Sequence, residues 1–354
     1  MKAISKSRNF YWDNVKFFTI FSVVVFHFLL GIIDETPLAR AIYVFIYSFH
    51  MPTFLFVSGL FLKYDKNHGL RIDKLAFYIA LAYIYKFLIW AEENALGNAA
   101  EWHWVSTSNI PWYLIVTAEY MVFVYIIKKI SPKIVFPVSI IISLASGYVG
   151  LIGDQFCISK FIVFFPFFYA GYCLTPQKAE NFIKNNKVRI YAISFFIVFG
   201  IISLIFTDEV SVLRNFFSAR ISYDYAGYPV FGIFLRALQY VISSIMILGW
   251  CSLIWTKQIP FFTKAGSRTI SVYFWHYFLV PVIAYIGLDK TLVEFSALLG
   301  IVCLFAIGFI VTCLFSMKVF NYPLNFISTV ITKVNNKICD SKLLKKMSKT
   351  ANTK

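Results

Sequence analysis

Charge is scarce in this chain: of its 354 residues only 14% are Asp, Glu, Lys or Arg, and only 17 are acidic. Ordinary soluble domains carry about 25% charged residues and are about half apolar. Here 59% of the residues are hydrophobic, 20% are aromatic, and the mean hydropathy is +0.72. The composition therefore excludes an ordinary soluble domain and predicts an integral membrane protein.

The shortage of acidic residues leaves a formal net charge of +16. In a soluble protein this excess would suggest a nucleic-acid partner. Here the basic residues fall between apolar runs and in the C-terminal tail, where they orient helices and contact anionic lipid headgroups. We therefore expect membrane lipids as partners and no nucleic acid.

Motifs for phosphate, metal and disulfide chemistry are also missing. The chain has no glycine-rich phosphate loop, which argues against kinase or nucleotidyl chemistry. Its cysteines form no CxxC pair and have no metal-ligand spacing, so we expect small apolar side chains between helices, with no disulfide and no metal. They are Cys157, Cys173, Cys251, Cys303, Cys313 and Cys339.

Long apolar runs fill most of the chain. A helix needs roughly 20 apolar residues to cross a bilayer, and ten runs are close to that length. They are Val15–Ile33, Ala41–Leu62, Leu75–Ala91, Ile110–Ile127, Ile134–Ile152, Cys157–Leu174, Ile190–Phe206, Val230–Trp255, Thr269–Gly287 and Leu292–Ser316. The predicted fold is an all-α integral membrane protein with about ten transmembrane helices.

Two of these runs are less regular than the others. Pro137 and Pro166 interrupt the fifth and sixth runs, and Lys160 lies inside the sixth. The loops between the runs are short, so we expect one multi-spanning membrane domain over residues 1–316. Residues 317–354 form a basic cytoplasmic tail that is too small for a core of its own.

The basic residues predict the orientation of the spans. With the N-terminus in the cytoplasm, most Lys and Arg residues face the cytoplasm, as the positive-inside rule requires. An even number of spans then places both termini in the cytoplasm. The segments on the outer side contain only Arg40, Lys160, Arg214, Arg220 and Lys290.

Two histidines lie in the middle of the first two runs, His27 and His50. Ionisable groups at membrane depth are costly unless they face a protein interior or a watery cavity, so they are functional candidates. At about 1.5 Å of rise per residue, both imidazoles lie near the middle of the bilayer. The short connection Asp34–Arg40 makes the two helices antiparallel neighbours, so their histidines can share a cavity.

Lys16 extends this pattern toward the cytoplasm. It precedes His27 by about three helical turns, so both side chains project from one face of the helix. Asp13 is three residues before Lys16 and is placed to pair with it. Simpler interpretations remain open: each histidine can be hydrogen-bonded between helices, and Lys16 can extend to the interface.

Other polar residues are weaker candidates. Arg236 and Glu119 lie deep in predicted spans, where a charge usually needs a partner. His276 is a candidate as well, or else an interfacial residue. In the outward segment Asn94–Asn109, Trp102 and Trp104 suit stacking on a sugar as well as they suit the membrane interface. The long outward segment Thr207–Pro229 is a candidate lid over an acceptor site.

Four sequence segments resemble a known family. They are YWDNVKFFTIFSVVVFH (11–27), SFHMPTFLFVSG (48–59), PWYL (111–114) and GSRTISVYFWHYFLVP (266–281). The chain resembles the acyltransferase-3 superfamily of membrane O-acyltransferases, in particular its fucose 4-O-acetylase-like branch. It departs from the broader pattern at Lys16, where an arginine is usual, and a Trp-x-Leu segment followed by glutamate is met only loosely by Trp112, Leu114 and Glu119.

This resemblance implies a function. Such proteins take an acetyl group from cytoplasmic acetyl-CoA, a substrate rather than a bound cofactor, to a hydroxyl of a cell-surface polysaccharide or its lipid-linked sugar precursor in the bacterial cytoplasmic (inner) membrane. His27 would be the base or the acyl carrier, His50 its helper, and Lys16 with Asp13 would bind the donor. A possible acceptor or structural site comprises Glu119, Trp112, Arg236, His276, Trp102 and Trp104.

One alternative class stays open at this point. A transporter or flippase of a lipid-linked glycan or acyl donor would also carry ionisable groups at the bilayer midplane and broken helices. An acyltransferase with a His-x4-Asp motif is a poorer match, because the residue five positions after His27 is Ile32.

Overall fold

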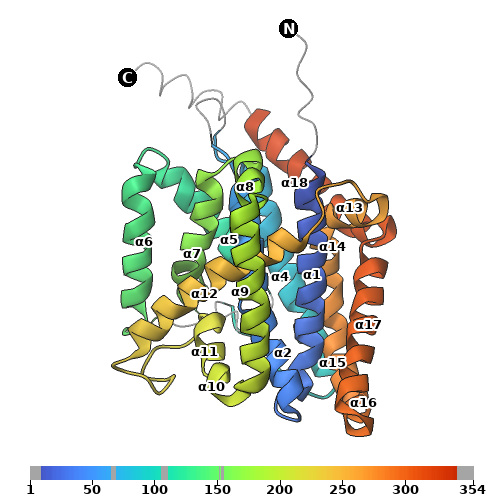
Figure 1. Ribbon diagram of the computed structural model, residues 1–354. Helices are drawn as coiled ribbons and strands as arrows, with labels where there is room; N and C mark the ends of the chain where they lie inside the picture. The colour runs from blue at the N-terminus through green and yellow to red at the C-terminus, as the bar shows by residue number, and fades with distance from the viewer. Residues whose placement is uncertain (1–8, 65–68, 105–110, 151, 153–154, 341–354) are drawn as a thin grey trace.

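A computed structural model describes residues 9–64, 69–104, 111–150, 152 and 155–340, and the regular structure in these ranges is helical (Figure 1). Residue Ile110, the predicted start of the fourth span, and residues 341–354 of the predicted tail lie outside the described residues.

The N-terminal third contains the helices with the two central histidines. They are α1 (Phe10–Leu29), which continues as a 3-10 turn η1 (Leu30–Ile32), then α2 (Pro37–Tyr47), α3 (His50–Phe61) and α4 (Ile72–Ala95). The Asn9 side chain caps α1 by accepting from the Trp12 amide, and Thr36 caps α2 in front of Pro37.

The second predicted span is divided between two helices. The Met51-Pro52 pair predicts a break at the proline, but the break lies earlier, between Tyr47 and His50, and α3 begins at His50. Pro52 fits in the first turn of α3, where amide groups have no partner inside the helix. The break places His50 and Met51 at a helix start inside the bundle.

The middle of the chain contains α5 (Trp112–Ile127), α6 (Pro132–Ser146), α7 (Ile158–Cys173), α8 (Pro176–Ile183) and α9 (Asn186–Ile205). Pro137 and Pro166 lie inside α6 and α7 without ending them. A bend of 101° separates α7 from α8.

The C-terminal part begins with α10 (Thr207–Ser211), α11 (Leu213–Ser218), α12 (Gly232–Leu253) and α13 (Pro260–Gly266). It continues with α14 (Thr269–Trp275), the 3-10 turn η2 (His276–Phe278), α15 (Leu279–Tyr285), α16 (Leu288–Phe295), α17 (Ala297–Phe315) and α18 (Lys318–Asp340). The ninth predicted span is therefore α14, η2 and α15 together, and its helix tightens at His276.

The structure confirms an all-helical protein with membrane-spanning helices, but with fewer candidate spans than ten. In the described residues six helices are long and apolar enough to cross a membrane, and up to eight are if each bent pair counts as one span. The apolar helices α5 and α6 are 16 and 15 residues long. At about 1.5 Å per residue, each helix is shorter than a hydrocarbon core of about 30 Å, so neither is counted as a candidate membrane span.

Helices α3 and α7 pack closely through two glycines. A Cβ atom on Gly59 of α3 would overlap the carbonyl of Phe168, and one on Gly171 of α7 would overlap the carbonyl of Phe56. Small residues let helix backbones approach closely in membranes, where packing replaces the hydrophobic effect as the source of stability. This contact fixes α3, and with it Met51, against α7.

Helix α1 lies inside the bundle, whereas other helices expose apolar side chains outward. Val15, Val24 and Leu29 of α1 are fully buried, while Ile205 of α9 and Leu298 of α17 are more than half exposed. The start of α1 and the helix α18 lie at the same end of the molecule (Figure 1). α18 packs on α4 and α14, where the Trp275 indole donates to the Phe320 carbonyl at 2.9 Å.

Candidate active site

Two cavities lie along the buried helix α1. The Lys16 cavity has a volume of about 250 Å³, and the lining includes Lys16, Ile20, Val23, Met51, Phe54 and Tyr273. The His27 cavity has a volume of about 220 Å³, and the lining includes His27, Tyr47, His50, Met51, Trp112 and Tyr277. Both belong to the interior of the bundle, where a reaction can be kept apart from lipid.

One stripe of α1 faces both cavities. Lys16, Ile20 and Val23 line the first, and His27 lines the second. Their spacing of four, three and four residues keeps them on one face of an α-helix. Lys16 and His27 therefore lie at the two ends of one line of side chains.

His27 is half-buried and surrounded by rings. Its imidazole centroid lies 5.2 Å from that of Phe26, 5.3 Å from that of His276 and 5.3 Å from that of Tyr277. Its Nδ1 atom is buried and has no hydrogen-bond partner among the residues described. A buried ring nitrogen without a partner costs free energy, so this atom is a candidate for a role in the chemistry of the site.

His276 is fully buried next to His27. Its Nδ1 lies 2.9 Å from the carbonyl oxygen of Val272. Because a carbonyl only accepts, Nδ1 carries the proton and donates, and Nε2 of the neutral ring keeps its lone pair. This Nε2 atom is also buried and unpartnered within the described part of the chain. His276 is therefore buried inside the bundle and is not exposed at its surface.

His50 is buried and oriented in the same way, with Nδ1 donating to the carbonyl of Ile46 at 2.8 Å. Its ring lies 4.5 Å from that of Phe26 and 5.4 Å from that of Tyr47, measured between centroids. His50 and His27 line the same cavity, and Phe26 contacts both imidazoles. His276 is the histidine in ring contact with His27.

Lys16 forms the ion pair that its spacing predicts, with Nζ 2.7 Å from Oδ1 of Asp13. Nζ also lies 5.8 Å from the centroid of the Phe61 ring. Lys74, on α4, lines the same cavity, so two cationic side chains border it.

Two cationic side chains that the sequence patterns do not place there line the His27 cavity. Lys160 of α7 is buried, with Nζ 5.6 Å from the Trp112 ring centroid, and Arg220 follows α11. Ser218, the last residue of α11, lines the same cavity. Lys160 could have been found from the sequence, because it is a charged residue inside an apolar run. Arg220 could not, because its position at the cavity depends on how the chain folds after α11.

Arg236 stands behind the cavity. Its guanidinium is buried, donates from Nη1 to the carbonyl of Phe216 at 2.9 Å, and lies 5.6 Å from the Phe216 ring centroid. Arg236 therefore holds α11, the helix that brings Ser218 to the cavity, and does not itself line the cavity.

The remaining candidates are elsewhere. Glu119 is half-buried on α5 and lines neither cavity. Trp102 packs against Trp90 and Trp104, with ring centroids 6.0 and 5.3 Å away, and Trp104 is 69% exposed. Neither tryptophan lines the His27 cavity. Residues 105–109 of the predicted Asn94–Asn109 segment lie outside the described residues.

The fold and the two cavities along α1 are those of an all-helical membrane protein with an interior site that contains histidines. The chain belongs to the acyltransferase 3 family: the family model, an acyltransferase domain, matches residues 9–317. No curated protein and no solved structure matches the chain. The matched region contains the residues that line both cavities and ends directly before α18. Membership of this family indicates a membrane acyltransferase.

Proposed function

We propose that this protein moves an acetyl group from cytoplasmic acetyl-CoA to a hydroxyl of a cell-surface polysaccharide or its lipid-linked sugar precursor, in the bacterial cytoplasmic (inner) membrane. One observation supports it above the rest. Lys16 and His27 lie on one stripe of α1, and each lines one of two adjacent cavities. In acetyl-CoA the anionic phosphates and the thioester lie at opposite ends of the molecule. Its site therefore needs a cation at one end, for the phosphates, and a base at the other end, where the thioester reacts.

In this proposal the donor occupies the Lys16 cavity. Lys16 and Lys74 attract the phosphates of CoA, and the apolar walls suit its extended pantetheine arm. Lysine attracts phosphate as a point charge rather than through the paired hydrogen bonds of arginine. Asp13 keeps the Lys16 ammonium directed along the helix through their 2.7 Å ion pair.

His27 acts on the acyl group. The unprotonated nitrogen of its imidazole takes the proton of the acceptor hydroxyl, and the hydroxyl oxygen attacks the thioester carbonyl. The carbon–sulfur bond then breaks, and CoA leaves as a thiolate that receives the proton from His27. Attack by the imidazole itself, with a transient acyl-histidine, would use the same geometry. In both cases His27 becomes positively charged, and the lone pair on Nε2 of His276 stabilises that charge.

The acceptor occupies the His27 cavity. Tyr47 and Trp112 provide flat faces for a sugar ring, and Lys160 and Arg220 suit an acceptor that carries a carboxylate or phosphate. His50 orients the acceptor through its Nε2. The motifs at 11–27 and 48–59 and the lysine at position 16 support the fucose 4-O-acetylase-like branch for this chain.

Both termini lie in the cytoplasm in this proposal. The distribution of basic residues supports that orientation, as does the position of α1's start and α18 at one end of the molecule (Figure 1). The Lys16 cavity then opens toward the compartment that contains acetyl-CoA.

The test uses membrane vesicles that contain the protein, acetyl-CoA labelled in its acetyl group, and polysaccharide or lipid-linked saccharide from cells lacking the protein. We expect labelled saccharide with the wild type and none with His27→Ala, at equal protein levels in the membrane. His103→Ala is the matched control, because this histidine is exposed and lies outside both cavities. Equal O-acetylation in cells with and without the protein would refute the proposal, and saccharide translocation without acetyl transfer would favour a flippase.

A further inference from the structure

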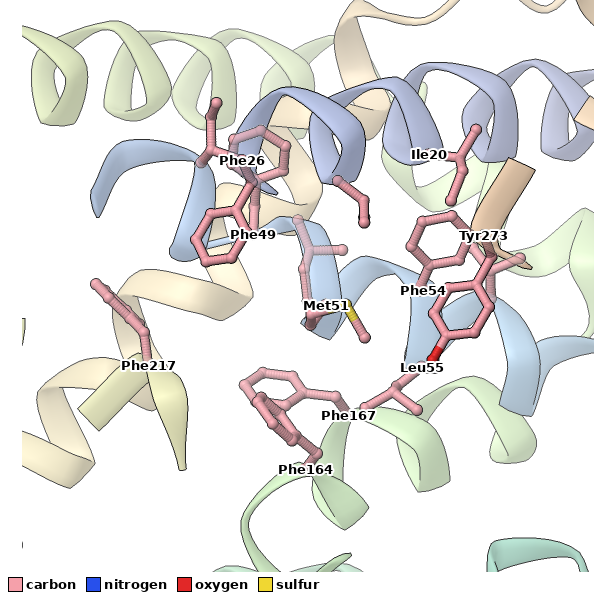
Figure 2. Close-up of a cluster of buried hydrophobic side chains, with 14 of the residues drawn as sticks. Ile20, Phe26, Phe49, Met51, Phe54, Leu55, Phe164, Phe167, Phe217 and Tyr273 are labelled. Atoms are coloured by element: carbon pink, nitrogen blue, oxygen red, sulfur yellow. The ribbon is translucent and has the colours of Figure 1, made fainter. Parts of the chain in front are cut away.

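The two cavities have one lining residue in common. Of the residues that the structure describes, Met51 alone lines both the Lys16 cavity and the His27 cavity. Figure 2 shows Met51 between Phe26 and Phe49 on one side and Ile20, Phe54 and Tyr273 on the other.

The cavities are stacked along the same helices, so the division occurs at one level of the bundle. Besides α3, three segments contribute to both cavities through residues about one helical turn apart. These pairs are Val23 and His27 of α1, Phe168 and Phe164 of α7, and Tyr273 and Tyr277 of α14 and η2. Any group that travels from Lys16 to His27 along this line therefore passes Met51.

The backbone near Met51 is anchored by its neighbours, and the Met51 side chain is of an intrinsically flexible type. It is the second residue of α3, and the neighbouring His50 is held by the carbonyl of Ile46. Gly59 and Gly171 hold α3 against α7 further along the helix. Methionine is unbranched and has three rotatable side-chain bonds, so it adapts to its neighbours more readily than the rings around it.

We propose that Met51 is a movable partition that admits straight-chain acyl thioesters from the Lys16 cavity to His27 and rejects branched or aromatic acyl groups. This inference rests on the proposed function. A straight acyl chain is about as wide as the methionine chain it displaces, whereas a branch point or a ring must also displace the aromatic walls. In its resting position the partition keeps the acceptor and water out of the donor cavity.

The first experiment compares donors. Acetyl-CoA and isobutyryl-CoA are supplied to wild type, Met51→Ala and Met51→Leu, and the ratio of the two transfer rates is measured. We expect the isobutyryl-to-acetyl ratio to rise about 10-fold or more in Met51→Ala, since one or two methyl groups in a fitted apolar site change discrimination by that order. Met51→Leu retains a large side chain and is expected to keep the ratio within a few-fold of the wild type.

Met121→Ala is the matched control. Met121 is also a buried methionine that lines the Lys16 cavity, but it does not line the His27 cavity. We expect its ratio to stay near that of the wild type. If Met51→Ala and Met121→Ala raise the ratio equally, or if neither does while the wild type transfers acetyl groups, the partition is refuted and the acyltransferase function stands.

A second measurement does not depend on turnover. Leu30→Cys places a thiol in the His27 cavity, and a membrane-impermeant thiol reagent is added to sealed vesicles only on the side to which the Lys16 cavity opens. We expect Leu30→Cys to be labelled faster when combined with Met51→Ala, with the protein lacking Leu30→Cys as background. Equal labelling rates would overturn the partition even if no acetyl transfer were found.

Discussion

The imidazole rings of His27 and His276 lie with their centroids 5.3 Å apart, although 249 positions separate the two residues in the chain. The buried Nδ1 of His27 and the buried Nε2 of His276 both lack hydrogen-bond partners among the residues described. Because Val272 fixes the tautomer of His276, its Nε2 offers a lone pair to a proton on His27. In the proposed function His276 is a positioning residue for His27.

Two substitutions of His276 distinguish stabilisation of a charged His27 from simple packing. We expect His276→Phe to lower kcat for acyl transfer about 100-fold, in line with the usual contribution of a general acid–base partner. The KM for acetyl-CoA should hardly change, because His276 does not line the Lys16 cavity. His276→Gln keeps an acceptor oxygen and should recover part of kcat. Equal kcat values for the Phe and Gln variants would show that the residue only fills space.

Lys16 is predicted to bind the phosphates of the donor. Lys16→Gln should raise the KM for acetyl-CoA about 10-fold, because a hydrogen bond to a charged group contributes about 1.5–3 kcal/mol. The variant should use acetyl-pantetheine, which has the same thioester and lacks the phosphates of CoA, as well as the wild type does. Lys63→Gln is the control, since Lys63 donates to the Leu174 carbonyl and lines neither cavity. An equal loss with both donors would assign Lys16 to packing of α1.

Sequence patterns predicted the class of fold and the line from Lys16 to His27 because both depend on local rules. Apolar runs predict spans, and helical periodicity places residues 11 positions apart on one face. The contact between His27 and His276 depends on how α14 packs against α1, and the break before His50 depends on packing around α3. Neither is a local property, so periodicity did not reveal them.

The acceptor side was the harder part to predict for the same reason. Trp102 and Trp104 have the composition of a sugar-binding surface, but Trp102 packs against Trp90 and Trp104, and neither Trp102 nor Trp104 lines the His27 cavity. Ser218 and Arg220 reach the cavity because Arg236 holds α11 by the carbonyl of Phe216. A carbonyl contact between residues 20 positions apart leaves no pattern in a single sequence.

Arg236 is therefore predicted to affect the acceptor and not the donor. Arg236→Met removes the 2.9 Å hydrogen bond to Phe216 but keeps a long apolar side chain. We expect the KM for the acceptor to rise about 10-fold, which corresponds to the loss of one hydrogen bond from a charged donor. The KM for acetyl-CoA should stay unchanged. Hydrogen exchange should become faster in residues 213–218 of α11. A change in donor KM alone would contradict the assignment.

The contact of Gly59 with α7 is predicted to hold Met51 at the division between the cavities. Gly59→Ala adds a Cβ where the Phe168 carbonyl lies, so α3 and α7 must separate. Overpacking of this kind costs about 1–3 kcal/mol, which should lower Tm and reduce acetyl transfer together. Gly150→Ala is the matched control, because a Cβ there meets nothing within 4 Å. If both variants melt at the wild-type temperature, the close approach of the two helices does not stabilise the bundle, and the fixed position of Met51 must depend on other contacts of α3.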